Sequence, residues 1–230
     1  MIILEIANLP GNAAKYSVAQ TPRHAATQLT GKKIGFLGSS ITIGAGSLNE
    51  SFVDFLTAEV GIIPAESAIS GTTLAGPASD SYIERLHSDF KNVTSLDAFV
   101  CQLSTNDDRQ GKAVGQITDA FDSGSFDTTT TTGALEEICA EVTARYHCPI
   151  LCYTCLRDPQ ETDYAALIQQ LYRLQAKWHF QILDLWADEQ VKQATAAQPM
   201  AMMDDAHPTR FGYREIWTPR FEAALTALMS

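Results

Sequence analysis

Short apolar runs alternate with amphipathic segments along most of the chain. The runs that are apolar enough to be buried strands are 33–37, 62–68, 96–103, 149–153 and 181–186. Apolar residues that recur every three or four positions predict helices near 49–60, 135–146, 164–174 and 221–228. Apolar strands separated by amphipathic helices indicate a parallel sheet with helices on both faces. We therefore expect a single α/β domain built on a central parallel sheet.

Two segments do not follow this alternation. Residues 1–31 precede the first strand, and we interpret them as an N-terminal extension that adds an edge strand or a flap to the main domain, 32–230. Residues 107–131 form a long polar insertion after the third strand. Loops of this length in a compact domain are more often functional than accidental. We therefore expect the insertion to form a wall or lid beside the functional site.

Composition is consistent with one folded domain and disfavours several classes of partner. With 230 residues, 45% of them hydrophobic, the chain is long enough for one sizeable core. A net charge of −11 repels phosphate backbones, so we expect no nucleic-acid partner. No apolar run reaches the ~18 residues that a membrane-spanning helix needs, so we expect no membrane partner. The sequence does not indicate the oligomeric state.

The N-terminus and the cysteines are typical of a cytoplasmic protein. The first residues have only a short apolar run, lack a basic start and contain Glu5, which argues against a signal peptide. The 5 cysteines are odd in number and fit reduced thiols better than a disulfide framework. Cys152 and Cys155 have a redox-type spacing, but residues three apart on a strand point to opposite faces. We interpret them as two packed thiols.

Polar clusters follow several of the predicted strands. In a parallel α/β sheet the ligand sits outside the carboxyl ends of the strands. Gly-Ser-Ser-Ile-Thr at 38–42 follows the first strand, Gly71 follows the second, and Ser-Thr-Asn-Asp at 104–107 follows the third. Asp-Asp-Ala-His-Pro at 204–208 comes after the last strand. These clusters are therefore the candidates for catalysis.

The residue types in these clusters suit nucleophilic catalysis. A serine hydroxyl such as that of Ser40 needs a histidine to remove its proton, and His207 is the candidate. Asp204, three residues earlier, can hold the imidazole and stabilise its charged form. The oxyanion that forms needs donors, which the backbone N–H groups of Ser40 and Gly71 and the amide of Asn106 could supply.

The clusters, in this order, resemble the four sequence blocks of the SGNH hydrolases, also called GDSL-like esterases and lipases. The first block places the nucleophile at Ser40, the second centres on Gly71, the third on Asn106, and the last supplies Asp204 and His207. The resemblance runs from about residue 32 to 218. Two positions depart from the blocks: a serine at 39 replaces the family's aspartate, and a serine at 104 replaces its usual glycine.

The resemblance implies a three-layer flavodoxin-like fold and the hydrolysis of carboxylic esters through an acyl-enzyme on Ser40. It implies a small-molecule ester substrate, and no metal or organic cofactor. Small acyl groups, such as acetyl on a sugar, are the preferred expectation, with Arg109 and Gln110 at the mouth of the site. Two alternatives stay open: an acyltransferase that uses the same serine, and a non-catalytic ligand-binding relative.

The remaining histidines lack carboxylates or cysteines at the spacings typical of metal ligands. We interpret them as surface or packing residues; they are His24, His87, His147 and His179.

Overall fold

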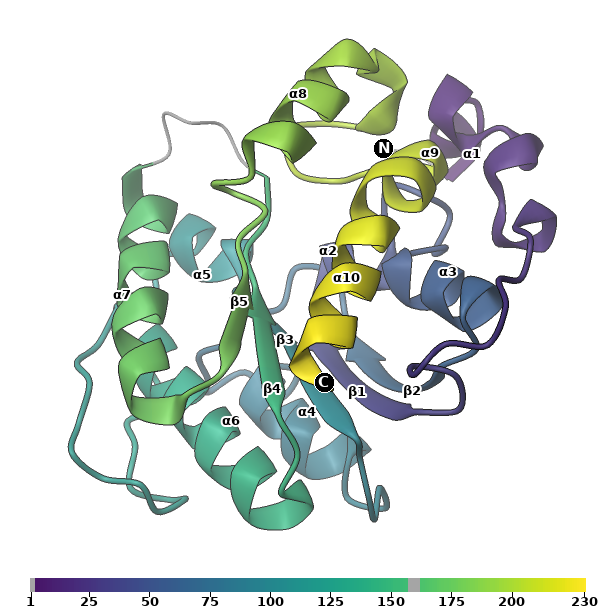
Figure 1. Cartoon of the computed structure of the whole chain (residues 1–230). Helices are drawn as coiled ribbons and strands as arrows, with labels where there is room; N and C mark the ends of the chain where they lie inside the picture. The colour runs from purple at the N-terminus through teal and green to yellow at the C-terminus, as the bar shows by residue number, and fades with distance from the viewer. Residues whose placement is uncertain (1–2, 157–161) are drawn as a thin grey trace.

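The fold is a parallel sheet sandwiched between two layers of helices (Figure 1). The computed structural model describes residues 3–156 and 162–230. Neighbouring strands pair in the order β2-β1-β3-β4-β5, and every pair is parallel. The strands are β1 (Lys33–Gly38), β2 (Ile63–Ala68), β3 (Ala98–Gln102), β4 (Ile150–Tyr153) and β5 (Gln181–Leu183). This order is that of the flavodoxin-like fold, so the predicted fold class is confirmed.

Each face of the sheet has its own hydrophobic core. On one face α3 (Phe52–Glu59) and α10 (Thr218–Leu228) pack together, and the rings of Phe52 and Phe221 stack at 3.7 Å. The other face is covered by α4 (Tyr82–Asp89), α6 (Thr131–Tyr146) and α7 (Thr162–Trp178).

Cys152 belongs to the core on the α6 side and Cys155 to the core on the α10 side. The two thiols are therefore buried on opposite faces, as their strand spacing predicted.

The remaining helical segments are short or peripheral. They are α1 (Ile3–Ala7), η1 (Pro10–Asn12), η2 (Ala14–Tyr16), η3 (Val18–Gln20), α2 (Ser40–Ile43), α5 (Thr105–Arg109), α8 (Glu189–Ala197), η4 (Pro199–Ala201), α9 (Arg210–Gly212) and the π-helical η5 (Tyr213–Trp217). No helix in the described part of the chain is both long enough and apolar enough to span a membrane.

The N-terminal extension forms helical turns rather than the edge strand offered as one possibility. Its first described half consists of α1, η1, η2 and η3. These turns are fixed by polar contacts with the body: the N–H of Val18 donates to Glu50 at 2.8 Å, and the side chain of Asn12 donates to the carbonyl of Gly46 at 2.9 Å. Backbone groups satisfied in this way have no need of a strand partner.

Most of the insertion packs against helices and does not form the expected lid. The ammonium of Lys177, on α7, donates to the carbonyl of Thr118 at 2.9 Å and pairs with the buried carboxylate of Glu136, on α6. The same ammonium lies 4.8 Å from the ring centre of Phe121 and 5.1 Å from that of Phe126. Figure 1 shows this loop descending along the outside of α7, toward the amino ends of the strands.

Candidate active site

The candidate nucleophile lies on a tight turn between β1 and α2. Ser40 is the first residue of α2 and is 8% exposed. The turn leaves no room for a side chain at Gly38, where an added Cβ would come within 1.6 Å of the Thr42 hydroxyl. Glycine at 38 therefore lets the strand pass directly into the helix and brings Ser40 to the carboxyl edge of the sheet.

The side chain of a buried glutamine fixes this turn through hydrogen bonds. The side-chain oxygen of Gln102, at the end of β3, accepts hydrogen bonds from the N–H of Ser39 at 2.9 Å and from the hydroxyl of Thr42 at 2.8 Å. Its amide nitrogen donates to the hydroxyl of Ser39 at 3.1 Å. Gln102 is fully buried. Sequence reasoning missed this residue, although a glutamine closing an apolar strand is itself an anomaly that needs buried partners.

The side chains of Ser40, His207 and Asp204 form a continuous hydrogen-bonded series. Nε2 of His207 lies 2.8 Å from Oγ of Ser40, and Nδ1 of His207 lies 2.9 Å from each carboxylate oxygen of Asp204. Carboxylates bind the Nδ1–H form of histidine, which leaves Nε2 as an acceptor for the serine proton. The structure therefore brings together the three side chains that the sequence proposed as a triad.

Asp204 is held as an anion by its surroundings. Burial raises the pKa of this carboxyl, but hydrogen bonds from the His207 ring and from the backbone N–H groups of Ala206 and His207 outweigh burial and lower the pKa to about 2. A tight turn from 204 to 207 makes these contacts possible. The turn is closed by the N–H of Met203, which donates to the carbonyl of His207 at 2.8 Å.

Asn106 lies in a helix and not at a strand end. It is the second residue of α5, whose N-cap is Ser104; the Ser104 hydroxyl accepts from the N–H of Asn106 at 3.1 Å. The amide of Asn106 donates one hydrogen bond to the carbonyl of Thr72 at 2.9 Å. An amide nitrogen carries two N–H groups, so this bond orients the side chain and leaves a second donor. Gly71, one residue before Thr72, has φ of 83°, a conformation that glycine adopts without strain.

Asp107 and Arg85 tie the clusters together, and sequence reasoning gave neither a role. The fully buried carboxylate of Asp107 accepts from the N–H of Leu74 at 2.7 Å and of Ala75 at 3.0 Å. Burial raises the pKa of Asp107 despite these bonds. The guanidinium of Arg85 donates to the carbonyl of Gly38 at 2.7 Å and to the hydroxyl of Thr72 at 3.1 Å. Together they fix the loop that carries Gly71.

Arg109 and Gln110 join α5 to neighbouring loops. Arg109 forms an ion pair with Asp205 at 3.0 Å, and the side chain of Gln110 donates to the carbonyl of Gly71 at 2.8 Å. These contacts connect α5 to the loops that carry His207 and Gly71, and the role of both residues at the mouth of the site stays a prediction.

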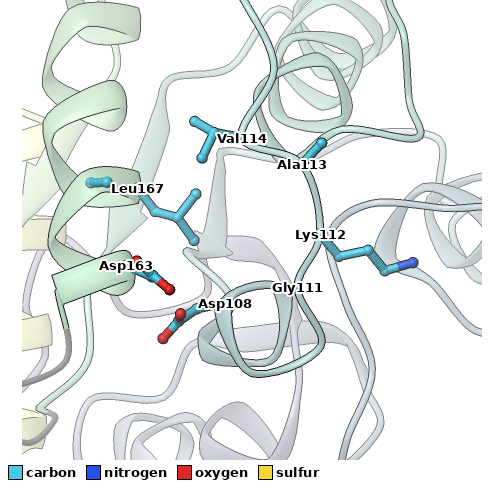
Figure 2. A pocket seen from close by; sticks show the side chains of 8 residues that line it. Asp108, Gly111, Lys112, Ala113, Val114, Asp163 and Leu167 are labelled. Atoms are coloured by element: carbon cyan, nitrogen blue, oxygen red, sulfur yellow. The ribbon is translucent and has the colours of Figure 1, made fainter.

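A cavity of about 340 Å³ lies between α5, the segment that follows it and α7, and Ser40, Asp204 and His207 are not among the residues that line it. Figure 2 shows the carboxylates of Asp108 and Asp163 at one end of this cavity and Val114 and Leu167 at the other. The side chain of Lys112 points away from it, and its ammonium donates to the carbonyl of Gly76. The cavity is therefore a neighbour of the site and not part of it.

A comparison with protein families supports the same reading of the blocks. The family model described as the GDSL-like lipase/acylhydrolase family matches residues 36–215. The chain belongs to this family. The matched range begins inside β1 and ends within η5, so it includes Ser40, Gly71, Asn106, Asp204 and His207.

Solved structures share the fold of this GDSL-like chain at low sequence identity. A protein from Lactobacillus plantarum superposes with a TM-score of 0.68 at 21% identity, over 87% of this chain and 99% of that one. A member of the lipolytic protein G-D-S-L family from Veillonella parvula gives a TM-score of 0.64 at 15% identity, over 85% and 99%.

A catalytic mutant of Axe2, an acetylxylan esterase from Geobacillus stearothermophilus, gives a TM-score of 0.60 at 18% identity, over 85% of this chain and 94% of that one. No protein of curated function matches the sequence significantly.

Proposed function

We propose that this GDSL-family hydrolase cleaves carboxylic esters through an acyl-enzyme on Ser40. The observation that carries the proposal is the hydrogen bond of 2.8 Å between Ser40 and His207, two residues 167 positions apart in the chain. A histidine that contacts a serine on one side and a carboxylate on the other is the arrangement that activates a hydroxyl nucleophile.

The proposed reaction has two halves. Oγ of Ser40 attacks the ester carbonyl while its proton passes to Nε2 of His207, and Asp204 stabilises the imidazolium. The tetrahedral intermediate then collapses: the carbon–oxygen bond to the alcohol breaks, and His207 gives its proton to the departing oxygen. Water then attacks the carbonyl carbon of the acyl-enzyme while its proton passes to His207. The carboxylic acid is released, and His207 returns the proton to Oγ of Ser40.

Three donors are available to the oxyanion in this proposal. We propose as these donors the backbone N–H groups of Ser40 and Gly71 and the second N–H of the Asn106 amide. The N–H of Ser40 belongs to the first turn of α2, and the N–H groups of a first helical turn have no partner within their helix. Donors fixed in advance stabilise charge more effectively than water, because they need no reorganisation.

Small acyl groups on polar alcohols, such as acetyl groups on a sugar, are the substrates we propose. We propose that Arg109, Asp205 and Gln110 form a polar mouth of the site, because their contacts join α5 to the loops that carry His207 and Gly71; such a mouth suits hydroxyl groups better than a long alkyl chain. Two structural neighbours of this chain are named acetyl xylan esterases, which favours the same class. We also propose the cytoplasm as its location, because four of the five cysteines are buried and their odd number fits reduced thiols better than a disulfide framework.

Replacement of the two adjacent serines tests the nucleophile. Ser40→Ala should abolish hydrolysis of p-nitrophenyl acetate and labelling by a fluorophosphonate probe, whereas the matched control Ser39→Ala should keep most of both. The measurements are steady-state rates, and mass spectrometry of the labelled peptide. An adduct on any residue other than Ser40 would contradict the assignment.

The same probe separates the two alternatives. Labelling of wild-type protein without ester turnover in water would favour an acyltransferase. The absence of labelling would favour a non-catalytic binder.

A further inference from the structure

A cavity of about 310 Å³, separate from the catalytic residues, lies between α3, the segment at 213–222 and the end of the N-terminal extension. Glu59, which lines it, is the last residue of α3, and the chain then enters β2 at the amino end of the sheet. Ser40 follows the carboxyl end of β1. Chemistry in this cavity is therefore independent of the proposed esterase site.

Three metal-ligating side chains converge in the cavity from three distant parts of the sequence. The ligand atoms of His24, Glu59 and Glu222 all lie within 4.8 Å of one another. Nδ1 of His24 and a carboxylate oxygen of Glu222 are 4.0 Å apart. The N–H of His24 donates to the carbonyl of Glu59 at 2.7 Å, so the backbone holds the histidine beside this carboxylate.

The second observation concerns the burial and the partners of Glu59. This residue is only 7% exposed, and its carboxylate has no hydrogen bond and no ion pair within residues 3–156 and 162–230. A carboxylate that is largely removed from water and lacks a hydrogen bond or an ion pair is stabilised when it coordinates a cation. The carboxylate of Glu59 faces His24 and Glu222, so a cation bound between them would satisfy it.

The net charge of the side chains that line the cavity is suited to a divalent cation. Its charged lining consists of three carboxylates, from Glu59, Glu215 and Glu222, and one guanidinium, from Arg214. With His24 neutral these groups carry a net charge of −2. Arg214 is already engaged, with Glu215 at 3.3 Å and with the carbonyl of Lys15 at 3.0 Å, which leaves Glu59 and Glu222 to a cation.

We propose that His24, Glu59 and Glu222 bind a divalent transition-metal ion, with Zn²⁺ the best match to this ligand set. One imidazole nitrogen and two carboxylate oxygens suit zinc, whereas Mg²⁺ and Ca²⁺ prefer oxygen ligands alone. Zinc–ligand bonds of about 2.0–2.2 Å require the side chains to move together by roughly 1 Å. His24, whose side chain is 47% exposed, has room for that movement, and water completes the coordination.

A metal at this position would join the extension to the body. His24 follows η3 in the extension, and its N–H donates to the carbonyl of Glu59 in α3, whereas Glu222 belongs to α10. Because the three ligands come together only in the folded protein, binding would stabilise that state.

Isothermal titration with ZnCl₂ after EDTA treatment and dialysis tests the proposal. We expect one equivalent of Zn²⁺ to bind, MgCl₂ to give no comparable signal, and saturating Zn²⁺ to raise Tm by about 5 °C. Glu59→Gln and His24→Ala should each weaken Zn²⁺ binding on the order of 10–100-fold or more. Glu59→Gln keeps the size of the side chain, so both variants should fold.

Two matched variants control for other ligands. His87→Ala removes a half-exposed histidine that pairs with Glu141, and Cys148→Ser removes the thiol that is not fully buried. Both should bind Zn²⁺ as the wild type does. The proposal is overturned if the wild-type protein binds no stoichiometric Zn²⁺, or if Glu59→Gln and His24→Ala bind it with unchanged affinity. Hydrolysis of p-nitrophenyl acetate, measured in parallel, reports separately on the proposed esterase function.

Discussion

Ser39 and Ser104, the two positions that depart from the family blocks, both have local partners in the structure. The hydroxyl of Ser39 accepts a hydrogen bond from Gln102 at 3.1 Å, and the hydroxyl of Ser104 caps the helix that carries Asn106. Neither side chain takes part in the hydrogen-bonded series from Ser40 to Asp204. These two departures therefore change residues that position the site and do not change the proposed reacting groups.

Loss of the Asn106 amide should slow catalysis without weakening substrate binding. We expect Asn106→Ala to lower kcat on the order of 10²–10³-fold with KM little changed, because the lost donor acts on charge that develops in the transition state. Steady-state kinetics on p-nitrophenyl acetate measures both constants. A mutant with full kcat would remove Asn106 from the oxyanion site and leave it as a residue that orients the Thr72 carbonyl.

The low pKa of Asp204 makes a prediction about stability and pH. A carboxyl whose pKa falls from 3.8 to about 2 on folding contributes stability that is complete above its unfolded pKa and is lost as the pH falls toward 2. The difference in unfolding free energy between wild type and Asp204→Asn should therefore be constant above about pH 5 and shrink below pH 4. Urea denaturation from pH 3 to 7 measures it.

Asp205→Asn is the matched control for this experiment. Asp205 pairs with Arg109 at 3.0 Å, whereas Asp204 contributes both carboxylate oxygens that lie 2.9 Å from Nδ1 of His207. If Asp205→Asn rather than Asp204→Asn shows the stronger loss of activity, the role of orienting His207 belongs to Asp205.

At the scale of elements, the sequence predicted the core strands but missed α4, which buries Tyr82, Ile83, Arg85 and Leu86, and α8, which has little buried surface. Helix α8 buries only Val191, so no apolar period marks it. The last strand was predicted to reach residue 186 but ends at Leu183, because Asp184 turns the chain by accepting from the Thr154 hydroxyl and the N–H of Ala187. Such contacts depend on residues distant in the sequence, which local periodicity does not register.

The residues of the candidate site could be predicted from the sequence more readily than the residues that hold them in place. The residues of the proposed triad and Asn106 lie in short blocks whose order is visible in the sequence. Gln102, Arg85 and the cluster around Glu59 are brought together only by the sheet and its helices. Asn106 itself was expected at a strand end and lies in α5, because the Ser104 side chain caps a helix there.

The contact of Lys177 with the insertion should matter for stability more than for substrate choice. Lys177 is 11% exposed and its partner Glu136 is fully buried. Removal of one member of a buried ion pair costs about 3–5 kcal/mol, so Lys177→Met should lower Tm by roughly 6–15 °C. Thermal unfolding, with relative rates on esters of rising acyl length, checks the expectation.

The double variant Lys177→Met with Glu136→Gln is the control, since it leaves no unpaired charge and should recover part of the lost stability. If Lys177→Met has a normal Tm and a changed ester profile, the insertion contributes to the substrate site after all.

At the scale of the whole molecule, the proposed catalytic residues come from opposite ends of the chain. Ser40 lies near the start and His207 near the end, and Asn12 of the extension lies between the segments that carry them. Its amide donates to the carbonyl of Gly46 and its oxygen accepts from the N–H of Arg210, both at 2.9 Å. Gly46 packs against His207 so closely that an added Cβ would lie 2.9 Å from the histidine Cβ.

Replacement of Asn12 should therefore disturb the approach of His207 to Ser40. Asn12→Ala leaves buried partners unsatisfied, and we expect kcat to fall on the order of 10–100-fold, because small misplacements of reacting groups carry such costs. The rate of fluorophosphonate labelling measures the reactivity of Ser40 directly. Asn8→Ala, at an exposed position in the same extension, is the matched control and should label at the wild-type rate. Equal rates for both variants would contradict this role of Asn12.

The position of Asn12 also bears on how a gene for this protein should be trimmed. A shortened gene that began at residue 32 would still encode every strand of the sheet and all three triad residues, and the family match itself begins only at residue 36. By sequence comparison such a product would look whole. It would lack the side chain that joins Gly46 to Arg210, so we expect it to label with the fluorophosphonate as slowly as Asn12→Ala does.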